Sequence, residues 1–249
     1  MRLVISTVEP IPDDPFVSGG TRCANGNHLA GGTRTGSHMT LVAFDFDGTL
    51  SDSEMMVLLG EQYGIAEEIA DITARAMRGE LSYAESLYER AELLEGLPEA
   101  EARAAYEQVY LRQGAAAVIE ALNDAGHTTA ILTGGFTPGV EAALDRDNAD
   151  VDHVVANELP VEDGHLTGGA EGPLIEGTKD DALEALCMET NTDLDDTVAV
   201  GDGANDLPML KAAGTAIGFI PKPAVRPHCD VVVATMPRLT RVFEEDGLL

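Results

Sequence analysis

The chain has 249 residues, enough for one large domain or for one domain with a smaller insert. Its 44 acidic residues outnumber the 15 basic ones and give a net charge of -29, so its surface would repel nucleic acid and anionic lipid, and neither is an expected partner. Only three of the basic residues are lysines. A strongly acidic, lysine-poor composition is typical of halophilic cytosolic proteins, in which high salt screens the self-repulsion; an acidic mesophilic enzyme is the alternative.

The cysteines favour a reducing compartment. Cys23, Cys187 and Cys229 are odd in number and far apart, and they show neither disulfide nor zinc spacing. No apolar run approaches the length of a membrane span, and the N-terminus lacks the apolar core of a secretory signal. We therefore expect a cytoplasmic protein that does not enter a membrane.

Residues 1–39 differ from the rest of the chain. Six glycines between positions 19 and 36 interrupt any periodicity, which predicts a disordered N-terminal extension. The run Gly36-Ser37-His38-Met39 matches the scar of a cleaved expression tag, and a reading frame that starts at Met39 is the alternative. On either explanation the segment lies outside the fold.

From residue 40 onward, strand patterns alternate with helical ones. Strands are expected at 41–46, 127–133, 151–156, 197–200, 215–218 and 231–234, and a short hairpin is expected over 159–168. Helices are expected at 114–125, 137–146, 178–190 and 206–213. Strands separated by helices predict an α/β fold, namely a Rossmann-like, doubly wound parallel sheet covered by helices.

The block 53–112 interrupts this alternation directly after the first strand and carries only helical signals. Ser82-x-x-Glu85 is a capping box, and Gly96 followed by Pro98 indicates that one helix stops and another begins. The block predicts a small all-helical cap domain over the carboxyl edge of the sheet. The core would then consist of 40–52 and 113–249.

Asp45-Phe46-Asp47-Gly48-Thr49 is the most informative segment of the chain. It closes the first expected strand, where alternation of side chains places Asp45 and Asp47 on the same side, at the edge where open α/β sheets bind ligands. A simple turn capped by Asp47 is the alternative. That alternative leaves Asp45 as a carboxylate buried in a strand without a partner, which is costly.

Two weaker signals follow. Thr133 and the glycines Gly134 and Gly135 end the second strand, where a hydroxyl and uncovered amides suit phosphate oxygens; an ordinary Gly-Gly turn is the alternative. Lys179 opens a helix, although the helix dipole disfavours a cation there, so it is expected to face an anion. A surface lysine paired with Asp180 or Asp181 is the alternative.

A second acidic strand end occurs at Gly201-Asp202-Gly203-Ala204-Asn205-Asp206. Asp202 follows a buried strand as Asp45 does, and the two would form a cluster of negative charge suited to a hard cation such as Mg²⁺. Asp206 fits two roles, either behind the metal ligands or as the cap of the following helix.

These motifs resemble the haloacid dehalogenase superfamily of phosphotransferases over residues 41 to about 245. The resemblance implies an aspartyl-phosphate mechanism, with Asp45 as the nucleophile and Asp47 as acid and then base. It implies phosphoryl contacts from Thr133, Gly134 and Lys179. It also implies Mg²⁺ bound by Asp45, the carbonyl of Asp47 and Asp202.

Within the superfamily, the chain is similar to the phosphoserine phosphatase group. The similar stretches are 45–54, 79–83, 86–90, 94–98, 133–136 and 200–206. By this likeness Glu54 would bind the substrate ammonium and Arg90 its carboxylate, and Asn205 would assist near the phosphate.

Each of these assignments has a structural alternative. Glu54 also completes a capping box with Ser51, and Arg90 could extend to the surface from its leucine-lined face. Tyr83 and Met77 could shape the pocket, but a role in the core is the stronger expectation for both.

The expected function is therefore Mg²⁺-dependent hydrolysis of O-phospho-L-serine to L-serine and phosphate, the last step of serine biosynthesis. A superfamily phosphatase or phosphotransferase acting on another small phosphate ester is the first alternative. A non-catalytic phosphate-binding regulator is an alternative of a different class. The sequence leaves the oligomeric state open.

Overall fold

The computed structural model describes residues 39–249. The extension expected over 1–39 lies outside the described residues, apart from Met39. Within the described range no helix is long and apolar enough to cross a membrane.

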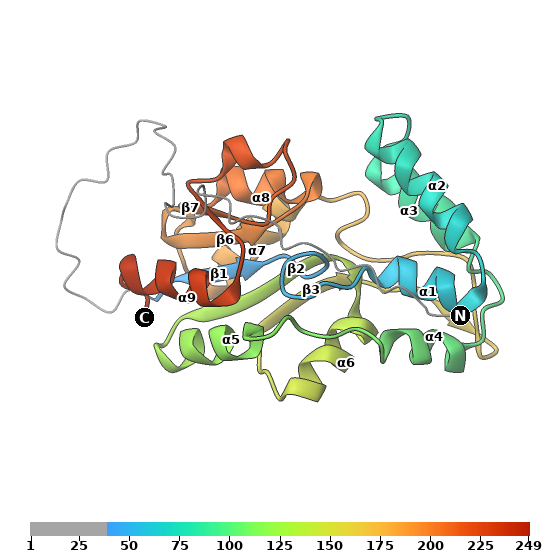
Figure 1. Cartoon of the computed structure of the whole chain (residues 1–249), viewed down its shortest axis with the longest axis horizontal. Helices are drawn as coiled ribbons and strands as arrows, with labels where there is room; N and C mark the ends of the chain where they lie inside the picture. Colours follow the sequence, from blue (N-terminus) through green and yellow to red (C-terminus); the bar gives the residue numbers. More distant parts are fainter. Residues whose placement is uncertain (1–38) are drawn as a thin grey trace, which may run out of the picture.

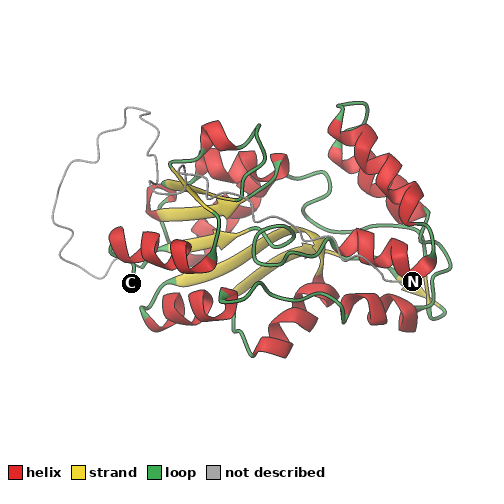
Figure 2. Ribbon diagram, in the orientation of Figure 1, coloured by secondary structure: helices red, strands yellow, loops and turns green. Residues whose placement is uncertain are grey.

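The described residues form a parallel six-stranded sheet in the order β3-β2-β1-β6-β7-β8 (Figures 1 and 2). Its strands are β1 (Leu41–Phe44), β2 (Thr128–Phe136), β3 (His153–Asn157), β6 (Thr197–Gly201), β7 (Thr215–Phe219) and β8 (Val231–Val233). The chain runs outward from β1 to β3 and then returns to the centre to build β6 to β8. The expected doubly wound sheet is confirmed, and its topological switch lies between β1 and β6, where such sheets bind ligands.

Helices cover both faces of the sheet. They are α5 (Ala115–Asp124), α6 (Thr137–Asp147), α7 (Lys179–Thr190), α8 (Leu207–Ala212) and α9 (Met236–Glu245). Figure 1 shows α5 and α6 below the sheet and α8 above it. Alternation along β1 sends Val42 and Phe44 into the core with α5 and α9, and Leu41 and Ala43 into the core with α7 and α8.

The first two strands differ in length from the prediction. β1 ends at Phe44. Beyond it, the amide of Asp45 still donates a hydrogen bond to the Val200 carbonyl on β6, at 2.8 Å, and the chain then turns away at Gly48. β2 continues to Phe136, with an irregular register against β3 after Leu132. The Thr133–Phe136 motif is therefore part of the strand.

Helix α9 was missing from the prediction. Its buried residues Met236, Leu239, Val242 and Phe243 recur at helical spacing, and Thr235 caps it by accepting a hydrogen bond from the Arg238 amide. This pattern is visible in the sequence and follows the short strand β8 directly.

Residues 55–106 form four helices, α1 (Met55–Tyr63), α2 (Ala66–Met77), α3 (Tyr83–Glu92) and α4 (Glu99–Tyr106), here called the helical insert. The predicted capping box at Ser82 and Glu85 is confirmed, and so is the start of a new helix at Pro98. The preceding helix already ends at Glu92, and Gly96, with a φ of 82°, lies in the turn between the two helices. Figure 1 shows α2 and α3 standing clear of the sheet. The predicted hairpin, β4 (Val161–Glu162) and β5 (His165–Leu166), meets the insert through a bridge between Pro98 and His165.

The two chain segments that connect the insert to the sheet are tied together by Arg112. Its guanidinium donates to the carbonyls of Gly48 and Thr49, each at 3.1 Å, and its amide donates to the Leu50 carbonyl at 2.7 Å. The entry and exit of the insert are therefore fixed next to the aspartates that follow β1.

Candidate active site

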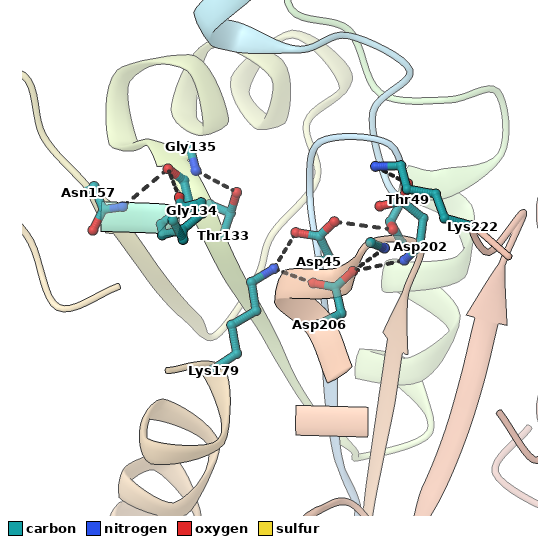
Figure 3. Close-up of polar contacts among 12 residues, drawn as sticks. Asp45, Thr49, Thr133, Gly134, Gly135, Asn157, Lys179, Asp202, Asp206 and Lys222 are labelled. Atoms are coloured by element: carbon teal, nitrogen blue, oxygen red, sulfur yellow. Dashed lines mark hydrogen bonds and ion pairs between the residues drawn. The ribbon is translucent and has the colours of Figure 1, made fainter. Parts of the chain in front are cut away.

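The acidic motifs meet at the carboxyl ends of β1 and β6 (Figure 3). Asp45 follows β1, Asp202 follows β6, and Lys179 is the first residue of α7. All three side chains are buried. The parallel topology produces this meeting, because it aligns the carboxyl ends of neighbouring strands.

Lys179 connects two aspartates. Its Nζ lies 2.5 Å from Oδ1 of Asp45 and 2.6 Å from Oδ1 of Asp206. Asp180 and Asp181 instead accept hydrogen bonds from Thr178, so the alternative of a surface lysine paired with them is wrong. The expectation that Lys179 faces an anion is confirmed.

These charges shift one another's titration. Burial and the neighbouring Asp206 raise the pKa of Asp45 to about 7, against the attraction of Lys179. Burial alone would lower the pKa of Lys179, but Asp206 and Asp45 more than offset this and hold the pKa above its ordinary value. Lys179 is therefore a permanent cation in the site.

Asp206 organises the loop after β6. Its Oδ2 accepts hydrogen bonds from the amides of Asp202 at 2.9 Å and Gly203 at 2.8 Å, while Oδ1 faces Lys179. In the described structure its side chain makes no capping bond to α8. The alternative that Asp206 merely caps α8 is wrong. A Cβ at Gly201 would lie 2.6 Å from the Asp206 carboxyl carbon, which explains the glycine there.

The acidic cluster has the composition of a cation site. Carboxylate oxygens of Asp45, Asp202 and Asp206 all lie within 4.8 Å of one another, and all three residues are buried. Buried carboxylates are tolerated when they are paired or bound to metal, and carboxylate oxygens are the ligands that hard divalent cations prefer. The residues present therefore fit a divalent cation.

Lys222 adds a second positive charge at the rim of the cluster. Its Nζ lies 3.1 Å from Oδ2 of Asp202. Burial raises the pKa of Asp202 and Lys222 opposes that rise. Sequence reasoning missed Lys222, although a signal existed, since the chain has only three lysines and two of them lie at this site.

Asp47 lies beside this cluster in a different environment. Its Oδ2 accepts a weak hydrogen bond from the Met55 amide at 3.4 Å, whereas its Oδ1 is buried without a partner among the described residues. Burial, together with repulsion from Glu54 and Asp45, raises the pKa of Asp47 well above its ordinary value. Such a carboxyl is suited to donating a proton at neutral pH.

The Thr133–Gly135 backbone forms a second polar group of the site (Figure 3). The Thr133 hydroxyl accepts from the Gly135 amide at 3.0 Å, and the Gly134 carbonyl accepts from Asn157 Nδ2 and from the Tyr83 hydroxyl, each at 3.1 Å. A Cβ at Gly135 would lie 3.1 Å from Oδ2 of Asp47 and 3.2 Å from the Thr133 hydroxyl, so these two groups flank the same glycine.

A cavity of about 280 Å³ opens beside this group. Among its walls are three of the predicted site residues, Gly134, Lys179 and Asn205. Tyr83 also lines it and is 38% exposed, and Met77 is 74% exposed, so the expectation that both belong to the core is wrong. Asn157 was not predicted, because nothing in the local sequence of β3 indicates a bond to β2.

Arg90 lies on α3 of the helical insert and Glu54 directly precedes α1, and neither is among the residues that line this cavity. Glu54 is the residue before α1 and its side chain makes no capping bond in the described structure, so the capping-box alternative is wrong. Arg90 is half-buried and uses Nε to bond the Ser86 carbonyl at 3.0 Å. Desolvation raises the pKa of Glu54, and the positive charges of Lys222 and Arg90 oppose this rise.

Comparison with known proteins gives consistent matches. The family model of haloacid dehalogenase-like hydrolases matches residues 42–211. Phosphoserine phosphatase of Halobacterium salinarum is 56% identical over 210 residues, which are 84% of this chain and 100% of that protein. Phosphoserine phosphatase of Lactococcus lactis is 43% identical over 187 residues, which are 75% of this chain and 86% of that protein.

Solved structures of phosphoserine phosphatases also match this chain. A phospho-aspartyl intermediate analogue of phosphoserine phosphatase superposes with a TM-score of 0.76 at 35% identity, covering 82% of this chain and 98% of the other. A substrate-bound phosphoserine phosphatase complex gives 0.76 at 34% identity, covering 84% and 98%.

Proposed function

The chain belongs to the haloacid dehalogenase-like hydrolase family, and we propose that it hydrolyses O-phospho-L-serine to L-serine and phosphate. The observation that carries this proposal is the 56% identity to phosphoserine phosphatase of Halobacterium salinarum over the whole of that protein. The buried pair of Asp45 and Lys179 at the end of β1 supplies a nucleophile beside a fixed cation, as phosphoryl transfer requires.

In the first half-reaction an Asp45 oxygen attacks phosphorus while the bond to the serine oxygen breaks. Asp47 donates its proton to that departing oxygen, which its raised pKa favours. Lys179 neutralises charge on the phosphoryl oxygens, and the Thr133 hydroxyl and the Gly134 amide donate hydrogen bonds to them. The products of this step are L-serine and an aspartyl phosphate on Asp45.

In the second half-reaction Asp47, now ionised, takes a proton from water as the water oxygen attacks phosphorus. The bond to Asp45 breaks, phosphate leaves, and both aspartates return to their starting states. Asp47 therefore serves as acid and then as base.

We further propose that the cation is Mg²⁺, held by Asp45, the carbonyl of Asp47 and Asp202. When bound, Mg²⁺ would offset the negative charge that gathers between nucleophile and phosphoryl oxygens. Asp206 supports this site by accepting hydrogen bonds from the amides of residues 202 and 203 and from the Lys179 ammonium group.

Substrate selection is assigned to residues 53–112, which contain the helical insert and act as a cap domain over the core of 40–52 and 113–249. Glu54 would bind the ammonium and Arg90 the carboxylate of the substrate, and Asn205 would assist near the phosphate. A planar guanidinium is well matched to a carboxylate. The buried thiol of Cys187, which forms no disulfide in the described structure, supports a cytoplasmic setting for this last step of serine biosynthesis.

Phosphate release from O-phospho-L-serine, measured with Mg²⁺ at low and at molar KCl beside sugar and glycerol phosphates, tests the proposal. A strong preference for phosphoserine is expected. Preference for a sugar phosphate would keep the family chemistry and overturn the substrate. Absence of release from every ester, in both salts, would favour a phosphate-binding regulator.

A further inference from the structure

The Gly134 carbonyl joins the helical insert to the sheet. It accepts the Tyr83 hydroxyl, from the first residue of α3, at 3.1 Å, and it accepts Asn157 Nδ2, from the end of β3, at the same distance. Asn157 is fully buried and also accepts the Leu174 amide at 3.1 Å, so it is a fixed part of the core. The Tyr83 bond is thus the contact at this carbonyl that depends on where the insert lies.

The same peptide group leads toward the phosphoryl site. The carbonyl of Gly134 and the amide of Gly135 belong to one peptide bond, and that amide donates to the Thr133 hydroxyl at 3.0 Å. Because the Thr133 oxygen accepts this bond, its own hydrogen remains to be donated to a phosphoryl oxygen. The hydrogen bonds in the series therefore all run in one direction, from the Tyr83 hydroxyl to the Gly134 carbonyl and from the Gly135 amide to the Thr133 hydroxyl.

Hydrogen bonds in such a series strengthen one another, by roughly 10–30% per bond. A phosphoryl oxygen that accepts from Thr133 makes the Gly134 carbonyl a better acceptor for Tyr83. Desolvation raises the pKa of Tyr83, so the phenol remains a protonated donor at neutral pH. A Cβ at Gly134 would overlap the Tyr83 hydroxyl, so glycine is required for this contact.

We propose that Tyr83 is a positioning residue whose hydroxyl, acting through the Gly134–Gly135 peptide, couples the position of α3 to phosphoryl binding at Thr133. This inference rests on the proposed function, because it takes Thr133 as a phosphoryl ligand. Coupling between two sites is reciprocal, so phosphoryl binding stabilises the position of α3, and the position of α3 raises phosphoryl affinity.

Tyr83→Phe removes the hydroxyl and keeps the ring. Tyr63→Phe is a matched control, because Tyr63 is also 38% exposed and donates a 3.1 Å hydrogen bond to a carbonyl, that of Glu95, within the insert. The probe is inorganic phosphate. Its Kd is measured by calorimetry with Mg²⁺ present, and hydrogen exchange of the α3 amides is measured with and without phosphate.

We expect Tyr83→Phe to raise the Kd roughly two- to tenfold, as for loss of one neutral hydrogen bond, and Tyr63→Phe to leave it unchanged. Phosphate should slow exchange in α3 in the wild type and in Tyr63→Phe, and much less in Tyr83→Phe. An unchanged Kd together with undiminished slowing in Tyr83→Phe overturns the coupling while the proposed function stands. A wild type that neither binds phosphate nor hydrolyses phosphoserine overturns both.

Discussion

The ammonium group of Lys179 lies 2.5 Å from a carboxylate oxygen of Asp45, although 134 residues separate the two in the sequence. Both side chains are 4% exposed. Lys179 also pairs with Asp206, so two carboxylates surround one ammonium group in the protein interior. Buried ion pairs of this kind contribute little when intact, but they are costly to break, because the remaining charge stays buried without a partner.

Removal of Lys179 should therefore destabilise the protein. We expect Lys179→Met to lower the free energy of unfolding by about 3–5 kcal/mol without divalent cation, measured by urea denaturation at constant salt. Added Mg²⁺ should restore part of the loss by neutralising the carboxylates. Lys211→Met, at an exposed position of α8, is the control and should change stability by less than about 0.5 kcal/mol. Equal stability of the two variants would contradict the buried pair.

Substitutions of Asp45 and Asp47 should affect turnover and beryllium fluoride binding differently. Asp45→Asn removes the nucleophile and should abolish both turnover and beryllium fluoride binding, followed by fluorine NMR. Asp47→Asn keeps the nucleophile and should bind beryllium fluoride while kcat falls by about 10²–10⁴, as for loss of a general acid and base. A beryllium fluoride complex on Asp45→Asn would refute the assignment of the nucleophile.

Arg90 should discriminate between substrates by their carboxylate. We expect Arg90→Ala to raise KM for phosphoserine roughly 10- to 100-fold, as for loss of a charged hydrogen bond, and to affect phosphoethanolamine little, since it lacks the carboxylate. Arg75→Ala is the control, because Arg75 lies on α2 and pairs with Glu89 at 2.7 Å. Equal losses on both substrates would count against a carboxylate role for Arg90.

Glu54 should make substrate preference depend on pH. Desolvation raises the pKa of Glu54 above the ~4.3 of an exposed glutamate. On acidification Glu54 therefore becomes neutral at a higher pH than an exposed glutamate does, and it then no longer attracts the ammonium group. The measurement is the ratio of kcat/KM for phosphoserine to that for phospholactate, which lacks the amine, so that titration of the phosphate cancels. This ratio should fall on acidification, and Glu54→Gln should give a low ratio that does not vary with pH. A wild-type ratio constant from neutral to acid pH would exclude the ammonium role.

Salt should stabilise the protein. With a net charge of -29, repulsion among surface carboxylates opposes the folded state and is screened by added ions. We expect the midpoint of thermal unfolding to rise between 0.1 M and 2 M KCl, measured by circular dichroism. Stability that is independent of KCl, or falls with it, would favour the alternative of an acidic mesophilic enzyme.

Much of the fold was predictable because its signals are local. Alternating apolar residues and capping motifs specify individual strands and helices, and the order of strands and helices is enough to predict a parallel doubly wound sheet. The same local patterns gave Asp45 and Asp202 as aspartates at strand ends. The strand limits at Phe44 and Phe136 differed because they depend on pairing with neighbouring strands.

The sequence by itself determined the acidic motifs, the helical block and the expectation that Lys179 faces an anion. Only the tertiary structure decided which anions it faces, Asp45 and Asp206, and that Asp206 holds the β6 loop. It alone brought Tyr83 and Asn157 to the Gly134 carbonyl. Local patterns reflect the neighbours of a residue along the chain. The contacts of Lys179 and of the Gly134 carbonyl instead join residues 23 to 134 positions apart, and sheet order and helix packing fix their partners.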